Sequence, residues 1–144
     1  MRRSRAGSAV TLVTLSLSHK RKKMKHHELL AATAALEQIS GEGHPDDTEM
    51  EIYAALRVLR PVAEDVRTHL RTILREYTRQ EGDEMVWVDR LGYQDREAEF
   101  LAREAKGITT DQLPTFTRSS FGKLPSARLL LDLGPLFSSE EVEV

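Results

Sequence analysis

The most regular hydrophobic pattern of the sequence runs through residues 48–81. Thr48 and Glu51 are a candidate capping box at its start, and Gly82 is a candidate stop signal after its end. Pro61 removes one backbone hydrogen bond inside the pattern, so we expect a kink there or two helices in near-continuation. The apolar positions alternate at spacings of four and three residues, which is the heptad seam of a long amphipathic helix: Ile52, Leu56, Leu59, Ala63, Val66, Leu70, Ile73 and Tyr77.

A shorter helix is predicted upstream of the long one. Leu29, Ala32, Leu36 and Ile39 repeat at helical spacing, and the glycines and proline of residues 41–47 predict a loop. Two amphipathic helices joined by a short connection pack antiparallel most simply. Because the first helix is the shorter, the distal half of the long seam needs another cover. We expect that cover to be the C-terminal segment or a second copy of the chain.

The pattern changes after the two helices. Residues 85–88, Met-Val-Trp-Val, are strand-like, and Gly92 with Tyr93 is interpreted as the start of a returning strand. Residues 95–106 favour a helix that Gly107 stops.

The C-terminal part is mixed and turn-rich. A strand is predicted around residues 115–117, and a short apolar helix over residues 127–133, which Gly134 and Pro135 end. Residues 138–144 form an acidic tail. The predicted fold class is therefore mainly α: an antiparallel helical hairpin with a long second helix, a small β-hairpin or irregular strand pair, and a short C-terminal helix.

Charge divides the chain into two unequal parts. The first 27 residues contain eight Lys and Arg and no acidic residue, whereas the remainder holds 13 Lys and Arg against 23 Asp and Glu. We interpret residues 1–23 as a disordered basic extension, or as the product of a translation start placed upstream of a native start at Met24. An arm that binds nucleic acid is the alternative. Residues 24–137 are expected to form one domain.

Candidate chemistry is sparse. The chain has 144 residues and no cysteine, which excludes disulfides, thiolate catalysis and cysteine-based zinc sites. Neither a Gly-x-Ser-x-Gly elbow nor a phosphate-binding Gly-x-x-x-x-Gly-Lys is present. His26, His27 and His44, with Asp46 and Asp47, lack the spacing that would aim ligands at one metal ion. We expect no catalytic residues, no metal and no cofactor, and the chain is predicted not to be an enzyme.

Two sets of side chains are candidates for binding. The first is the distal seam with the lone tryptophan, which would contact a protein partner or a second copy: Val66, Leu70, Ile73, Tyr77 and Trp87. The second is a ridge of arginines spaced four apart, which would contact phosphates or form salt bridges with local acids: Arg67, Arg71, Arg75 and Arg79.

Several short motifs of the chain carry a family resemblance. Leu-Arg-Pro at residues 59–61, Gly-Tyr-Gln-Asp at residues 92–95 and Leu-Pro-Ser-Ala-Arg-Leu-Leu-Leu-Asp-Leu-Gly-Pro-Leu at residues 124–136 follow in that order. Over residues 24–137 the chain resembles a family of small uncharacterised phage and prophage proteins, which implies a virus-encoded context in the cytoplasm of a bacterial host and no catalytic residues. The predicted function is a non-enzymatic accessory protein that acts through protein–protein contacts. The alternative is a nucleic-acid-binding protein that uses the basic N-terminal arm and the arginine ridge, and no membrane association is expected.

Overall fold

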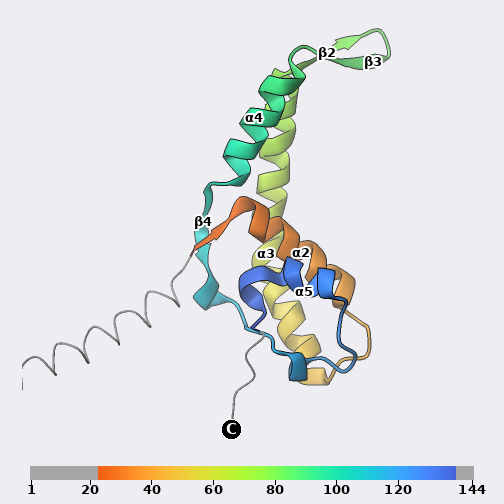
Figure 1. Cartoon of the computed structure of the whole chain (residues 1–144), viewed down its shortest axis with the longest axis vertical. Helices are drawn as coiled ribbons and strands as arrows, with labels where there is room; N and C mark the ends of the chain where they lie inside the picture. The colour runs from red at the N-terminus through yellow and green to blue at the C-terminus, as the bar shows by residue number, and fades with distance from the viewer. Residues whose placement is uncertain (1–22, 139–144) are drawn as a thin grey trace, which may run out of the picture.

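The computed structural model describes residues 23–138, and the fold is mainly α (Figure 1). An antiparallel pair of helices, two small antiparallel strand pairs and a short C-terminal helix make up the chain, in agreement with the predicted fold class. Of the predicted extension over residues 1–23, only Lys23, the first residue of β1, is described, and residues 1–22 and residues 139–144 of the predicted acidic tail lie outside the described residues. In chain order the elements are β1 (Lys23–Lys25), α2 (His26–Ile39), α3 (Asp46–Glu76), β2 (Thr78–Glu81), β3 (Glu84–Trp87), α4 (Arg90–Leu101), β4 (Glu104–Thr109), the 3-10 turns η1 (Thr110–Gln112) and η2 (Arg118–Ser120), α5 (Ala127–Leu133) and the 3-10 turn η3 (Gly134–Leu136).

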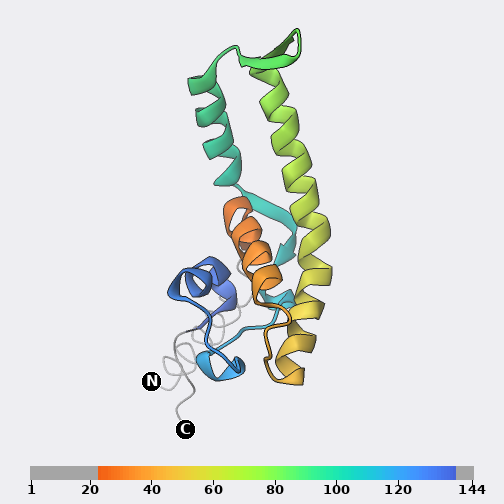
Figure 2. The ribbon, with the colours of Figure 1, turned by 90° about the vertical axis from the view of Figure 1, so that its right-hand side faces the viewer.

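Helix α3 runs the length of the molecule and supports two shorter helices. Figure 2 shows α2 beside its first half and α4 beside its second half, both on the same side. With 31 residues, α3 spans ~46 Å. We call the second half of α3 with α4 and the β2–β3 hairpin the arm, and the rest of the described chain the base.

The base holds the main hydrophobic core. Side chains from α2, the first half of α3, α5 and η3 fill it, and Phe116 is its largest fully buried side chain. Thr33, also buried, donates its hydroxyl to the carbonyl of Leu29 at 2.7 Å, so its polar atom has a partner. This core positions the arm by fixing the first half of α3.

A smaller core holds the arm together. Val66 and Ile73 of α3 pack against Phe100 of α4, and half-buried side chains such as Leu70 and Tyr93 surround them. The distal seam is therefore covered by α4. Our expectation that the C-terminal segment or a second copy covers it is wrong, because the chain returns along α3 after the hairpin.

The long helix differs from its prediction at both ends. It begins at Asp46 after Pro45, and the Thr48 hydroxyl donates to the carbonyl of Ser120, so the predicted capping box with Glu51 is wrong. It ends at Glu76, where residues 78–81 leave the helix to pair as a strand with residues 84–87.

Pro61 does not divide α3, so the alternative of two helices is wrong. The proline is exposed, and the carbonyl that loses its partner belongs to the exposed Arg57 four residues earlier. Water can bind that carbonyl at the surface, which limits the cost of the missing hydrogen bond.

The second half of the chain was the less predictable part. The predicted helix over residues 95–106 is α4, which occupies Arg90–Leu101 instead, and Gly92 and Tyr93 lie in its first turn and not in a strand. Residues 104–109 form β4, which pairs antiparallel with β1, more than 75 residues away in the sequence. The strand predicted around residues 115–117 is reduced to one bridge between Phe116 and Phe137.

The C-terminal helix agrees with its prediction. Helix α5 covers Ala127–Leu133, the Ser126 side chain accepts a hydrogen bond from the amide of Leu129, and Gly134 follows with φ +54°. No helix within residues 23–138 is both long and apolar enough to cross a membrane.

Candidate functional site

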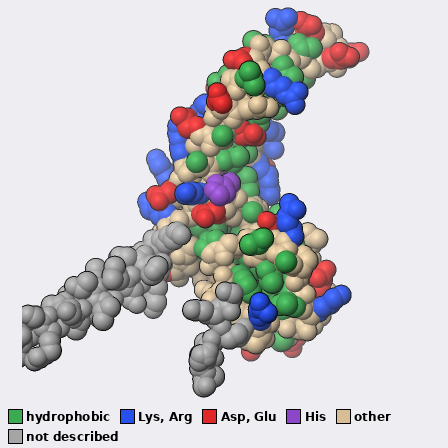
Figure 3. Space-filling model, viewed as in Figure 1, with side chains coloured by type: hydrophobic (Ala, Val, Ile, Leu, Met, Phe, Trp, Pro, Cys, Tyr) green, Lys and Arg blue, Asp and Glu red, His purple; other side chains and the backbone are tan. Residues whose placement is uncertain are grey.

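Four large apolar side chains are exposed where the arm ends. We call these side chains the tip patch: Met85 and Trp87 on β3, Val88 directly after it, and Leu91 in the first turn of α4. The exposed fractions of their surfaces are 57%, 43%, 60% and 73%, in that order. Figure 3 shows hydrophobic side chains among acidic and basic ones at this end of the molecule. Exposed apolar side chains are typical of surfaces that bind other molecules when they gather in one region, as these four residues within positions 85–91 do.

The β2–β3 hairpin sets the orientation of two of these side chains. Its register pairs Thr78 with Trp87 and Gln80 with Met85, so Met85 and Trp87 stand on one face of the ribbon. Gly82, with φ +62°, occupies the first central position of the two-residue turn, as a type II′ turn requires. The hairpin thus presents the methionine and the indole side by side.

The indole of Trp87 is held in place by neighbours from α4. The Tyr93 ring lies 5.3 Å from it, centre to centre, and the Arg90 guanidinium lies 5.7 Å from the indole centre in a cation–π contact. Tyr93 is itself fixed, because its hydroxyl donates to a Glu97 carboxylate oxygen at 2.8 Å and its ring meets Tyr77 edge-on. Because these contacts already restrict the Trp87 side chain, it loses little conformational entropy when it binds a partner.

Burial and Glu97 together change the acidity of Tyr93. Desolvation raises the pKa of the Tyr93 phenol above its ordinary value of 10.0, and the hydrogen bond to Glu97 and the charge of that carboxylate raise it further. Tyr93 is therefore neutral, and available as a hydrogen-bond donor to Glu97, throughout the physiological pH range.

Gly92 lies close to two side chains at the start of α4, so a larger residue there would require one of them to shift. The Asp89 side chain accepts a hydrogen bond from the amide of Gly92 at 2.9 Å and caps the helix. A Cβ at position 92 would lie 2.3 Å from an Asp89 carboxylate oxygen and 3.0 Å from the Tyr77 ring. Because residue 92 has no side chain, the Tyr77 ring and the capping carboxylate of Asp89 can both lie beside it, next to the tip patch.

The predicted partner-binding residues divide into three groups. Val66 and Ile73 are buried, with 4% and 1% exposed, so the arm core already uses them. Leu70 and Tyr77 are half-buried at the margin of that core, and Trp87 is exposed.

The tip patch includes Met85 and Leu91, which the sequence reasoning missed, beside Val88, which follows Trp87 in the strand-like run of residues 85–88. Met85 and Val88 belong to the uninterrupted apolar run of residues 85–88, and Leu91 follows the charged pair Asp89 and Arg90, so the signal available was an apolar run bounded by charged residues. Their exposure depends on how much of the hairpin α4 covers, which the periodicity does not reveal.

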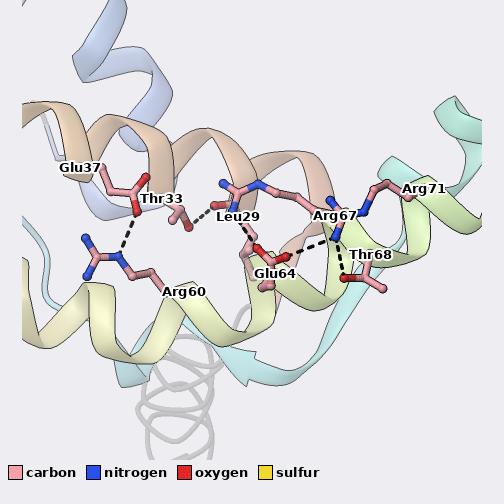
Figure 4. Close-up of polar contacts among 8 residues, drawn as sticks. All are labelled: Leu29, Thr33, Glu37, Arg60, Glu64, Arg67, Thr68 and Arg71. Carbon is pink, nitrogen blue, oxygen red and sulfur yellow. Dashed lines mark hydrogen bonds and ion pairs between the residues drawn. The ribbon is translucent and has the colours of Figure 1, made fainter.

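Three of the four predicted phosphate contacts already have acidic partners. Arg67 and Arg71 both pair with Glu64, at 3.7 and 3.3 Å, and Figure 4 shows the two guanidinium groups approaching that one carboxylate. Arg79 pairs with Glu81 across one intervening residue. Arg75 is exposed and forms no ion pair with another residue of the described chain. The ridge thus matches the salt-bridge interpretation at three of its four positions.

Three of the histidines, His26, His44 and His69, are used in packing. The Nδ1–H of His26 donates to the carbonyl of Phe100 at 2.8 Å, and the His69 ring lies 4.8 Å from the Phe100 ring. His44 is buried, and its Nδ1 accepts a hydrogen bond from the amide of Gly122 at 3.1 Å. Between Lys23 and Ser138, no group of three or more His, Asp or Glu side chains is placed to hold a metal ion.

A shallow cavity of about 370 Å³ lies where the arm joins the base. Its wall contains His26, His69 and Phe100, and its charged members are Asp65, Arg103, Glu104 and Lys106, so acidic and basic groups balance. No cluster of like charges or trio of metal ligands converges in this cavity, and its residues mainly join two hydrophobic cores.

Comparison with known proteins gives this chain no relative. No family model, curated protein or solved structure matches it. The functional assignment therefore depends on the site geometry.

Proposed function

We propose that this chain is a non-enzymatic accessory protein that binds another protein through the tip patch. The observation that carries the proposal is the exposure of Trp87, Met85, Val88 and Leu91 at the end of the two-helix arm. Tryptophan dominates the energetics of many protein interfaces, and a preorganised side chain loses less entropy on binding. An arm built on a helix of ~46 Å presents this surface away from the base.

Charge around the tip patch defines the kind of partner that it fits. Residues 78–91 contain four acidic side chains, Glu81, Asp83, Glu84 and Asp89, against two arginines, Arg79 and Arg90. Asp83 and Glu84 form no ion pair within the described chain. A complementary partner therefore offers an apolar pocket with basic residues at its rim.

The same charge disfavours nucleic acid at the tip patch. An acidic rim repels phosphates, and three of the four ridge arginines are paired with glutamates. The phage or prophage context remains a prediction from the resemblance, and the neighbouring genes test it directly.

Paired variants test the proposed function. We compare the wild-type chain with Trp87→Ser/Leu91→Ser, and with Met50→Ser/Val58→Ser as a control that removes exposed apolar side chains from α3, far from the tip. The proposal predicts that the control binds a purified partner like the wild type, whereas the tip variant binds at least ~10-fold more weakly. Equal binding by all three proteins would contradict it.

A further inference from the structure

The β2–β3 hairpin has two strand edges without a neighbouring strand. Its sheet contains only these two strands within residues 23–138, and Figures 1 and 2 both place the hairpin beyond the last turn of α3 and the first turn of α4. The amide of Val88 donates to the carbonyl of Tyr77 at 2.8 Å, so these two residues form a hydrogen-bonded pair where the strands begin. Because hydrogen-bonded and non-hydrogen-bonded pairs alternate along antiparallel strands, this pair fixes the direction of every backbone group in the hairpin.

The alternation turns the backbone groups of Met85 and Trp87 outward. Trp87 with Thr78, and Met85 with Gln80, are the non-hydrogen-bonded pairs of the ladder. The amides and carbonyls of Met85 and Trp87 therefore point away from β2. Within residues 23–138 no backbone hydrogen bond from outside the hairpin uses them. Each of these groups can pair with a strand that is added beside β3.

The side chains of β3 favour an added strand, whereas those of β2 do not. The sequence of β3 is Glu-Met-Val-Trp, without the lysine or proline that commonly protects a strand edge, and the sequence of β2 is Thr-Arg-Gln-Glu, without a hydrophobic residue. Val88 and Leu91 continue the exposed apolar surface past the end of β3. A strand added beside β3 would therefore cover apolar side chains and pair with backbone groups at the same time.

Charge at the turn defines which strand fits. The ion pair at this end of the hairpin joins Arg79 to Glu81, and Asp83 and Glu84 have no ion pair within residues 23–138. Antiparallel pairing is the more stable arrangement per residue, and it places the C-terminal end of an added strand beside the turn. Basic residues at that end would complement the two free carboxylates. A second copy is a poorer occupant, because it brings the same carboxylates to the contact.

We propose that the edge of β3 binds an extended segment of a partner protein as an added antiparallel strand, with apolar residues at alternate positions and basic residues at its C-terminal end. The inference rests on the proposed function, because it states how the tip patch binds its partner. The backbone groups of Met85 and Trp87 hold the segment whatever its sequence, and the tip patch selects its side chains.

A synthetic peptide tests the inference. Valine and threonine alternate along the peptide, two lysines follow at its C-terminus, and fluorescence anisotropy measures its affinity for the full-length chain. An otherwise identical depsipeptide has esters in place of its amides, so it keeps the side chains and loses the N–H donors. The inference predicts that the peptide binds at least ~10-fold more tightly than the depsipeptide.

Hydrogen exchange in the complex locates the bound peptide. The amides of Met85 and Trp87 should exchange at least ~10-fold more slowly when the peptide is bound, because they gain hydrogen-bond partners. The amide of Gln80, which points outward from the opposite edge, is the internal control and should exchange at an unchanged rate.

Two proline variants distinguish the edges of the hairpin. Met85→Pro removes an outward N–H from β3, and Gln80→Pro removes the outward N–H directly opposite on β2, so neither variant loses a hydrogen bond of the ladder. Met85→Pro should bind the peptide at least ~10-fold more weakly, and Gln80→Pro should bind it like the wild type. Circular dichroism checks both folds. If either variant fails to fold, the depsipeptide and the exchange rates decide, because both use the wild-type chain.

Several results would overturn the inference. These are equal affinity for the peptide and the depsipeptide, no binding of either, weaker binding by Gln80→Pro alone, and dimerisation of the chain that Met85→Pro abolishes. Each of them leaves the proposed function standing, because that function requires only that the tip patch bind some protein. The proposed function fails by a different result, which is equal binding of a purified partner by the wild type and by Trp87→Ser/Leu91→Ser.

Discussion

The phenyl ring of Phe100 stacks on the imidazole of His26 at 4.2 Å, although 74 positions separate the two residues in the sequence. This stacking joins the last turn of α4 to the first residue of α2. The backbone reinforces it, because the amide of His26 donates to the carbonyl of Arg103 at 2.9 Å. Phe100 therefore connects the arm core to the base, and the direction of the arm depends on it.

Phe100→Ala should loosen the arm before the base. The substitution removes the largest buried side chain of the arm core, and we expect the free energy of unfolding to fall by about 3–5 kcal/mol. Hydrogen exchange should show weaker protection in α4 and the second half of α3, with α2 less affected. Leu101→Ala, at a half-buried neighbour, is the control and should lower the free energy of unfolding by less. A uniform decrease in protection throughout the protein would contradict a separate arm core.

Gly122→Ala should destabilise the base. A Cβ at position 122 would lie 2.7 Å from the carbonyl oxygen of Gly43, a backbone atom that cannot move without shifting the loop before α3. The amide of Gly122 also donates to His44 in the same place. We expect a decrease of about 1–3 kcal/mol in the free energy of urea unfolding, against little change for the exposed neighbour Lys123→Ala. Equal stability of the two variants would mean that the two loops do not pack as described.

Stability should fall in alkaline solution as Tyr93 ionises. The pKa of this phenol is raised in the folded protein, so the unfolded chain loses the proton first, near pH 10. The contribution of Tyr93 to the free energy of unfolding is therefore fully present below pH 10. It declines as the pH rises from there toward the raised pKa of Tyr93 in the folded protein. Tyr93→Phe should remove that part of the decline, as measured by urea unfolding at several pH values.

The acidity of Tyr93 can also be measured directly. Ultraviolet titration should show one of the three tyrosines ionising later than in the unfolded chain. Glu97→Gln should lower the pKa of Tyr93 only part of the way, because desolvation is the largest cause of the shift. A complete return to the ordinary value would contradict this order of causes.

The arginine ridge should contribute little to nucleic-acid binding. Arg67 and Arg71 both pair with Glu64, so we expect Arg67→Ala/Arg71→Ala to leave any affinity for duplex DNA unchanged. If these arginines did bind phosphates, removing each one would lower the salt dependence of binding by about one unit of slope. Electrophoretic shifts at several salt concentrations measure this, and a flatter slope for the variant would favour the nucleic-acid alternative.

The elements with a repeating local pattern were the predictable ones. The heptad positions from Ile52 to Tyr77 indicated α3, because the spacing of apolar residues that predicts a helix is a local property of the sequence. Strand β4 was missed because its partner β1 lies far upstream, and residues 104–106 alone favour a helix. The end of α3 was missed because Gly82 is compatible both with a helix stop and with the hairpin turn that it forms.

The candidate site was predictable only in part, for a similar reason. Trp87 stood out by its residue type, but the exposure of Leu91 depends on the point where Asp89 caps α4. Val66 and Ile73 seemed available until the returning chain placed Phe100 over them. The spacing of apolar residues predicts a seam, but it does not determine whether another part of the chain packs against that seam.

Site-specific photocrosslinking in cells tests the central claim most directly. A photoreactive phenylalanine analogue at Leu91 lies in the tip patch, and the same analogue at Gln94, an exposed position one turn further along α4, is the matched control. We predict a discrete protein adduct from position 91, which disappears when Trp87→Ser is added, and none from position 94. Absence of an adduct at position 91, or equal adducts at both positions, would contradict a protein-binding arm.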